Sequence, residues 1–89
     1  MKKYLNHVDT FHKTFKVGEA ATAPTMLDEK ESELRFNLMK EENEEYREAC
    51  KNNDLTEIAD ALGDQLYILC GTILKHGLQN KIEEIFEEI

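Results

Sequence analysis

The chain of 89 residues has no tryptophan, one proline and only two cysteines. Two cysteines are too few for a disulfide scaffold, and Cys50 and Cys70 lack the spacing of a zinc finger. Both lie within apolar helical patterns, so we expect packed thiols in a reducing compartment. The longest apolar stretch, residues 66–74, is far shorter than the roughly 20 residues of a membrane span. Since no apolar run follows the basic start of the chain either, we expect a cytoplasmic protein without a signal peptide.

Positive charge is also scarce, with 11 Lys and Arg against 19 Asp and Glu and a net charge of −8. An acidic chain repels the phosphates of nucleic acids and of anionic membranes, so neither is an expected partner. An anionic substrate would need a bridging cation. The length predicts one domain, residues 1–89, whose small core favours oligomerisation.

Strand-like alternation is absent, and apolar residues recur at helical spacing nearly throughout. Gly18 and Pro24 mark one loop. Two capping-box patterns, Asp28 with Glu31 and Asp54 with Glu57, each predict the start of a helix. The expected helices cover about residues 4–15, 28–51, 54–76 and 78–89. The pattern therefore predicts an all-α, four-helix domain, a bundle that is completed by oligomerisation.

Acidic residues interrupt the apolar stripe of the second expected helix. That stripe consists of Leu34, Leu38, Met39, Tyr46, Ala49 and Cys50. Glu42 falls in its middle and Glu45 on its border, one turn later. A spacing of three residues brings these two carboxylates close enough to bind one cation together. Glu44 and Glu48 are expected to face solvent.

The third expected helix supplies the complementary acids. Glu57, Asp60 and Asp64 lie on one face of it, just before its apolar segment. Glu57 already has a role in the capping box, and this leaves Glu42, Glu45, Asp60 and Asp64 on two antiparallel helices. Four carboxylates without a suitable histidine or cysteine favour Mg²⁺, with Mn²⁺ as a substitute, over zinc. The expected chemistry is metal-assisted attack of water on a phosphoanhydride.

These motifs resemble those of the all-α nucleoside triphosphate pyrophosphohydrolases, a superfamily with MazG-like proteins, phosphoribosyl-ATP pyrophosphohydrolases and dimeric dUTPases. The resemblance rests on Glu41-Glu42-x-x-Glu45, on the run EIADALGDQLYILCGTILKHG and on the FHxxF segment that begins at Phe11. The FHxxF segment is similar to one in small MazG-like proteins. The resemblance covers nearly the whole chain.

The resemblance implies a MazG-like fold, a homodimer or dimer of dimers, and Mg²⁺-dependent hydrolysis of a nucleoside triphosphate to the monophosphate and pyrophosphate. The motif residues of the superfamily fall on Glu41, Glu42, Glu45 and Asp64, and together with the helix faces described above they lead us to expect metal binding by Glu42, Glu45, Asp60 and Asp64. Either Glu41 or Glu45 would orient the attacking water, and the choice between them stays open.

The chain departs from the superfamily at its second motif, Glu-x-x-Asp. Ala61 stands three residues before Asp64, where the motif has glutamate. Either Glu57-Ile58-Ala59-Asp60 is the operative copy, or Asp60 serves together with Asp64. We favour the second alternative and keep Glu57 as a supporting residue or a further ligand. The chain stops at Ile89, whereas relatives often continue with a polar, basic tail, so the substrate contacts stay unassigned.

Two alternative functions remain at the level of the sequence. The substrate could be phosphoribosyl-ATP, because a site that binds a metal ion and a triphosphate would bind this compound as well. A protein of another class, an acidic helical module without catalytic activity, would place the same carboxylates outward to bind basic partners.

Overall fold

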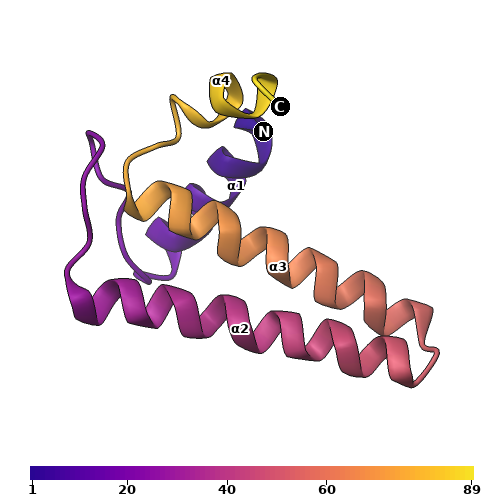
Figure 1. Ribbon diagram of the computed structural model, residues 1–89. Helices are drawn as coiled ribbons and strands as arrows, with labels where there is room; N and C mark the ends of the chain where they lie inside the picture. The colour runs from indigo at the N-terminus through magenta and orange to yellow at the C-terminus, as the bar shows by residue number, and fades with distance from the viewer. The chain divides into compact units, whose positions relative to one another are not determined.

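A computed structural model describes all 89 residues, and it confirms the all-α prediction: four helices and no strand (Figure 1). The helices are α1 (Lys2–Thr14), α2 (Glu29–Lys51), α3 (Leu55–Lys75) and α4 (Ile82–Glu87). None of them has the length and hydrophobicity that crossing a membrane would require. The chain divides into two compact units, one formed by Met1–Leu27 with Cys70–Ile89 and the other by Asp28–Leu69.

The first unit contains α1, α4 and the C-terminal end of α3. Its core consists of apolar side chains from α1 and α3, namely Leu5, Val8, Cys70, Ile73 and Leu74. The backbone of the loop after α1 is tied to the end of α3, because Ala21 N–H donates to the Leu74 carbonyl over 3.0 Å. The start of α1 is tied to α4 through a side chain, since Lys2 N–H donates to Glu83 Oε1 over 3.0 Å.

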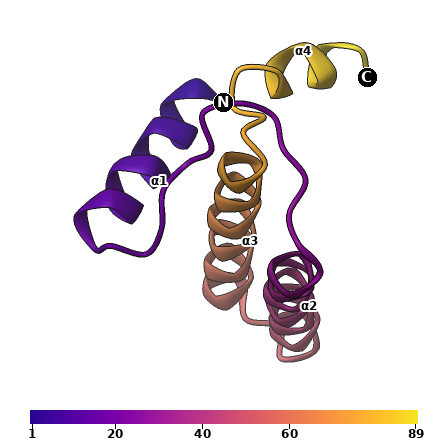
Figure 2. The same ribbon diagram turned by 90° about the vertical axis from the view of Figure 1, so that its left-hand side faces the viewer.

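The second unit is an antiparallel hairpin of α2 and the N-terminal part of α3, which lie side by side in both views (Figures 1 and 2). The tight turn between them includes Asn53, whose φ of 52° is left-handed, a conformation that asparagine tolerates better than most residues. Ala49 and Ala61, one from each helix, are buried. Such small side chains allow the two helices to approach closely. Arg35 adds a bond between them by donating to the Ile68 carbonyl over 3.1 Å.

Both predicted helix starts carry a side-chain cap. Asp28 Oδ1 accepts from Glu31 N–H over 2.7 Å, and Asp54 Oδ1 accepts from Glu57 N–H over 3.1 Å. Each bond satisfies one of the backbone donors that a helix leaves open at its N-terminus. The cap at Asp54 sets the register of α3, and this register places the acidic residues that follow.

The predicted end of α3 is confirmed, but the last helix is shorter than expected. Gly77 adopts a φ of 67°, and the N–H groups of Gly77 and Leu78 donate back to the carbonyls of Leu74 and Ile73. This is the Schellman pattern, which ends a helix. Residues 78–81 form turns after this cap, and α4 covers only Ile82–Glu87.

The expectation of packed cysteines is wrong for one of the two. Cys70 is fully buried, whereas Cys50 is exposed. Much of the expected apolar stripe on α2 is exposed as well, including Leu34, Met39 and Tyr46. The physical reason is that α2 packs against a single helix within its unit, and this contact covers only one side of α2.

We expect Asp54→Ala to destabilise the fold, because the substitution leaves the Glu57 N–H without its side-chain acceptor. The free energy of unfolding should fall by about 1 kcal/mol, which corresponds to a drop in the melting midpoint of roughly 4–8 °C. Thermal melts followed by circular dichroism would measure it. Asp54→Asn is the matched control, since asparagine caps equally well, and equal losses in both variants would contradict the capping role.

Candidate metal centre

The α2–α3 hairpin brings three carboxylates together. Glu42 and Glu45 lie one turn apart on α2, and Asp64 lies on α3. One oxygen atom from each of them lies within 4.8 Å of the other two. The antiparallel pairing produces this arrangement, because the turn after α2 returns the chain alongside it. We call these three residues the acidic trio.

Glu42 has the least solvated carboxylate of the trio. Its Oε2 atom is buried and has no hydrogen-bond partner. Burial raises the pKa of Glu42 above its ordinary value, and the negative charges of Glu45 and Asp64 raise it further, followed by a hydrogen bond with Glu45 and the charge of Glu41. An ionised carboxylate in this position lacks a compensating positive charge.

The acidic trio has the donor set of a hard divalent cation. All three side chains offer oxygen, and no histidine or cysteine belongs to the group. Mg²⁺ and Mn²⁺ prefer such ligands, whereas zinc in proteins usually takes nitrogen or sulfur. A cation would also supply the partner that Glu42 Oε2 lacks. The residues therefore fit a divalent metal ion, which Glu42, Glu45 and Asp64 would hold.

An acidic cleft of about 390 Å³ adjoins the trio. Its lining residues come from both helices of the hairpin and are Glu45, Glu48, Glu57, Asp60, Ala61 and Asp64. Asp60 lines this cleft but does not belong to the group within 4.8 Å. Glu57 also lines it, while its backbone N–H completes the cap of α3. Ala61, at which the motif departs from the superfamily, lies in the same wall.

The two candidates for orienting water differ in position. Glu45 belongs to both the acidic trio and the cleft. Glu41 is exposed and belongs to neither, although its charge contributes to the raised pKa of Glu42.

Glu48 is exposed, as expected, and it also lines the acidic cleft. It follows Glu45 at the same spacing of three residues that relates Glu45 to Glu42. That spacing was the available indication in the sequence, since it continues one line of carboxylates along α2.

Comparison with known proteins identifies the family. Residues 8–89 match the sequence model of the family described as phosphoribosyl-ATP pyrophosphohydrolase. The chain belongs to this family. The resemblance to the MazG-like all-α pyrophosphohydrolases is thereby confirmed, since the family is a member of that superfamily. No curated protein and no solved structure matches the chain.

Membership in the phosphoribosyl-ATP pyrophosphohydrolase family supports pyrophosphohydrolase activity on a nucleotide-like substrate. The family is typically dependent on a divalent metal, in agreement with the cluster of acidic residues in this chain.

The raised pKa of Glu42 predicts a pH-dependent effect of Glu42→Gln in the presence of a chelator. The folded state holds the Glu42 proton more tightly than the unfolded state, so ionisation of Glu42 destabilises the fold as the pH rises through the raised pKa. Glu42→Gln should therefore melt higher than wild type at neutral pH. The difference should shrink on acidification and vanish below the ordinary pKa of 4.5.

Thermal melts between pH 4 and 8 would measure this difference. Glu33→Gln, which removes an exposed glutamate from the same helix, is the control and should show no comparable trend. A Glu42→Gln variant that melts lower than wild type at every pH would contradict the burial of an uncompensated charge.

Proposed function

We propose that this chain hydrolyses a nucleoside triphosphate to the monophosphate and pyrophosphate with the help of Mg²⁺. The observation that carries this proposal is the convergence of Glu42, Glu45 and Asp64, with one buried Glu42 oxygen that lacks a partner. Family membership supports the same reaction class. Mn²⁺ should substitute for Mg²⁺, because both prefer oxygen ligands.

The charge of the site requires a bridge between protein and substrate. A triphosphate is an anion, and the cleft is lined by five carboxylates, so direct contact between them would be repulsive. Glu42, Glu45 and Asp64 would hold the metal ion. When bound, Mg²⁺ would offset the charge of the phosphate oxygens and lower the pKa of a coordinated water.

The reaction adds one water across the anhydride between the α and β phosphates. The water oxygen forms a bond to the α phosphorus, and the bridging oxygen leaves with pyrophosphate. Glu45 is the better candidate to orient this water, since it lies in both the trio and the cleft, and Glu41 is the less favoured alternative. Asp60, Glu57 and Glu48 line the cleft where they could hold a second ion or exclude a wrongly placed anion.

Phosphoribosyl-ATP is the second candidate substrate, and the family description is the observation that favours it. It carries the same triphosphate, so the metal site would serve both substrates alike. The non-catalytic acidic module fits less well. A module that binds basic partners would keep its carboxylates in solvent, whereas Glu42 Oε2 is buried.

We expect the purified protein, supplied with Mg²⁺, to release pyrophosphate from at least one member of a panel of canonical and modified nucleoside triphosphates and phosphoribosyl-ATP. Coupled detection of pyrophosphate and of orthophosphate would distinguish the products. Pyrophosphate from phosphoribosyl-ATP alone would select the second candidate substrate. Orthophosphate as the primary product would contradict the proposed reaction.

Among site variants, Asp64→Asn and Glu42→Gln should each lose activity by at least about a hundredfold, because each removes a charged metal ligand. Glu33→Gln should keep wild-type activity. Rates measured at saturating substrate across a Mg²⁺ titration would separate weaker metal binding from slower chemistry. If Asp64→Asn hydrolyses substrate at the wild-type rate, the acidic trio has no part in catalysis.

Mg²⁺ should also stabilise the fold without any substrate. An ion that binds only the folded state at a hundredfold excess over its Kd adds about 2.7 kcal/mol, and each kcal/mol raises the melting midpoint by roughly 4–8 °C. Asp64→Asn should lose most of this shift and, with one repelling charge fewer, should melt no lower than wild type in chelator. If Asp64→Asn instead responds to Mg²⁺ as wild type does, the trio is not the metal site.

A further inference from the structure

The acidic trio takes its ligands from two helices, so its geometry depends on how those helices are placed against each other. Glu42 and Glu45 both belong to α2, and the helix itself fixes their spacing. Asp64 belongs to α3. Whether its carboxylate meets the other two depends on how far α3 is shifted along α2 and rotated against it. We call this shift and rotation the register of the hairpin.

A metal site tolerates only small changes of the register. Neighbouring ligands of an octahedral Mg²⁺ lie about 3 Å apart, because each lies about 2.0–2.1 Å from the ion. A shift of α3 by one residue would move Asp64 by about 1.5 Å along the helix axis, half of that separation. Asp64 also lies ten residues, or roughly 15 Å, beyond the cap at Asp54, so a pivot of about 5° at the turn would displace it by about 1.3 Å. The turn alone therefore does not hold the trio in place.

The contact between α2 and α3 holds few large apolar side chains. Along α2 the positions that are not fully exposed are Glu31, Arg35, Leu38, Glu42 and Ala49. On the part of α3 within the same unit they are Ile58, Ala61, Gln65, Tyr67 and Ile68. Four of these ten positions carry a charged or amide side chain, and the two alanines are too small to interlock with a neighbour. Shape alone therefore specifies the register weakly, and polar contacts between the helices must contribute, as buried polar residues do in coiled coils.

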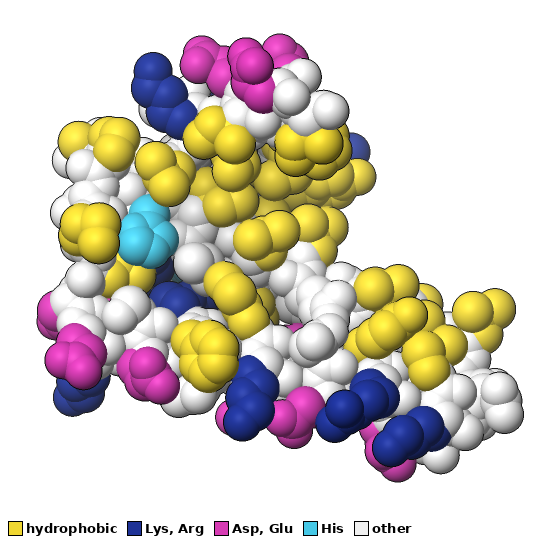
Figure 3. Space-filling model, viewed as in Figure 1, with side chains coloured by type: hydrophobic (Ala, Val, Ile, Leu, Met, Phe, Trp, Pro, Cys, Tyr) yellow, Lys and Arg dark blue, Asp and Glu magenta, His cyan; other side chains and the backbone are white.

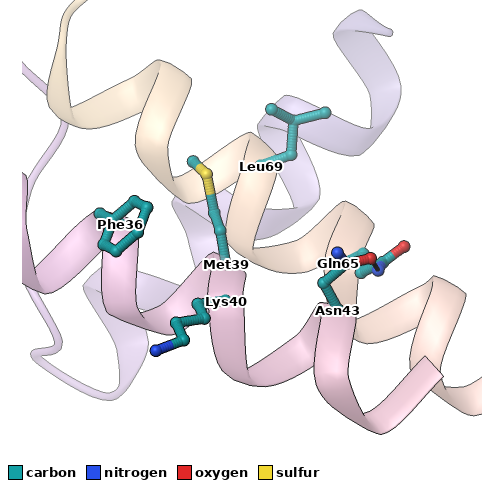
Figure 4. A pocket seen from close by; sticks show the side chains of 6 residues that line it. All are labelled: Phe36, Met39, Lys40, Asn43, Gln65 and Leu69. Atoms are coloured by element: carbon teal, nitrogen blue, oxygen red, sulfur yellow. Dashed lines mark hydrogen bonds between the residues drawn. The ribbon is translucent and has the colours of Figure 1, made fainter. Parts of the chain in front are cut away.

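Two hydrogen bonds join the helices across this contact. Arg35 Nη2 donates to the Ile68 carbonyl over 3.1 Å, and Gln65 Nε2 donates to Asn43 Oδ1 over 3.2 Å. We call these two bonds the register clamp. Asn43 and Gln65 meet across the two helices, directly beside the trio in sequence (Figure 4). The Arg35 bond lies on the far side of the trio from the turn, so the turn and this bond enclose the trio from both ends.

The bond of Arg35 constrains the backbone of α3 directly. Its acceptor is a main-chain carbonyl within α3, which cannot move without the helix. The guanidinium is half-buried, and desolvation lowers the pKa of Arg35, whereas electrostatic interactions with Glu31 and Tyr67 raise it. An arginine keeps its charge at neutral pH all the same, so this is a charge-assisted bond and a strong one.

Arg35 acts on the trio through position, because its charge lies too far away. It precedes Glu42 by seven residues, which is about 10 Å along the axis of α2. After burial, the influences that raise the pKa of Glu42 all come from neighbouring acids. The guanidinium therefore does not offset the charge of the carboxylates, and its contribution is the fixed relation between the two helices.

We propose that the register clamp makes the acidic trio selective for small divalent ions, with Arg35 as its main positioning residue. This inference rests on the metal site of the proposed function. Mg²⁺ requires near-ideal octahedral geometry at about 2.0–2.1 Å, whereas Ca²⁺ accepts irregular sets of about six to eight oxygens at about 2.3–2.6 Å. A hairpin held in one register satisfies the strict geometry of Mg²⁺. A hairpin whose register varies loses affinity for Mg²⁺ and still accommodates Ca²⁺.

Three substitutions by methionine test the clamp, because methionine keeps a long unbranched side chain and a high helix propensity. Arg35→Met and Gln65→Met each remove one bond of the clamp. Lys40→Met is the matched control, since it removes a cation of α2 that is closer to Glu42 in sequence. The Lys40 side chain points away from α3 (Figure 4), and its Nζ lies 4.0 Å from a Glu44 carboxylate oxygen. Exposed Lys and Arg side chains of this kind occur along α2 (Figure 3).

Competition between ions measures the selectivity without any substrate. Each protein is loaded with Mn²⁺ and titrated with magnesium chloride or with calcium chloride, and electron paramagnetic resonance reports the free Mn²⁺. The ratio of the Mg²⁺ affinity to the Ca²⁺ affinity should fall roughly tenfold in Arg35→Met, the lower end of the effect of residues that orient metal ligands. It should fall less in Gln65→Met, whose bond is the more exposed of the two. In Lys40→Met it should stay at the wild-type value.

The outcomes separate the clamp from the metal site itself. A wild type that binds none of the three ions would overturn the proposed function and the role of the clamp with it. If wild type binds Mg²⁺ but Arg35→Met weakens Mg²⁺ and Ca²⁺ by the same factor, the metal site stands and the selectivity role of Arg35 is wrong, because a loss of stability affects both ions alike. An equal change of the ratio in Lys40→Met would assign the effect to charge and refute the positional role. If Arg35→Met does not fold by circular dichroism, Gln65→Met decides, and an unchanged ratio there would refute the clamp.

Discussion

Repulsion among three carboxylates is the interaction that most constrains the α2–α3 hairpin. Glu42, Glu45 and Asp64 lie within 4.8 Å of one another at their closest oxygens, and one oxygen of Glu42 is buried without a partner. Burial first, and then the charges of Glu45 and Asp64, raise the pKa of Glu42, so an ionised Glu42 opposes folding in the absence of a cation. A divalent ion bound by the trio would make the same geometry a stabilising one. The proposed function and the stability of the fold would then depend on the same cluster.

The α2–α3 hairpin is built to hold that cluster in place. Asp54 caps α3 and thereby sets its register, the small residues Ala49 and Ala61 allow the helices to approach, and Arg35 bonds the two helices through the Ile68 carbonyl. The same hairpin separates two kinds of surface. Acidic residues line a cleft on one side, and apolar side chains with a central amide pair form the other.

The local features of the fold could be predicted from the sequence. Capping boxes at Asp28 and Asp54 and the stop at Gly77 are short-range patterns with a direct physical cause, and the structure contains each of them. The number of helices followed from the same patterns. The length of α4 did not, because the spacing of apolar residues from Leu78 to Ile89 does not show that residues 78–81 form turns.

Burial was harder to predict than helicity. Tyr46 and Cys50 lie at core-like positions of the α2 stripe, yet both are exposed, because periodicity shows which side of a helix is apolar but not what covers it. For the site, helical spacing placed Glu42 and Glu45 together, and the antiparallel turn placed Asp64 opposite them. The positions of Asp60 and Glu48 depend on the rotation of α3 against α2, which no local pattern in the sequence specifies.

The central claim is that the acidic trio holds a divalent cation, and a crystal grown with Mn²⁺ would test it most directly by anomalous scattering. The account predicts one strong peak between α2 and α3, with carboxylate oxygens of Glu42, Glu45 and Asp64 at about 2.0–2.2 Å, the range of a small oxygen-bound divalent ion. A crystal that contains Mn²⁺ only at other acidic residues, such as those of α4, with the trio bound to water alone, would contradict it.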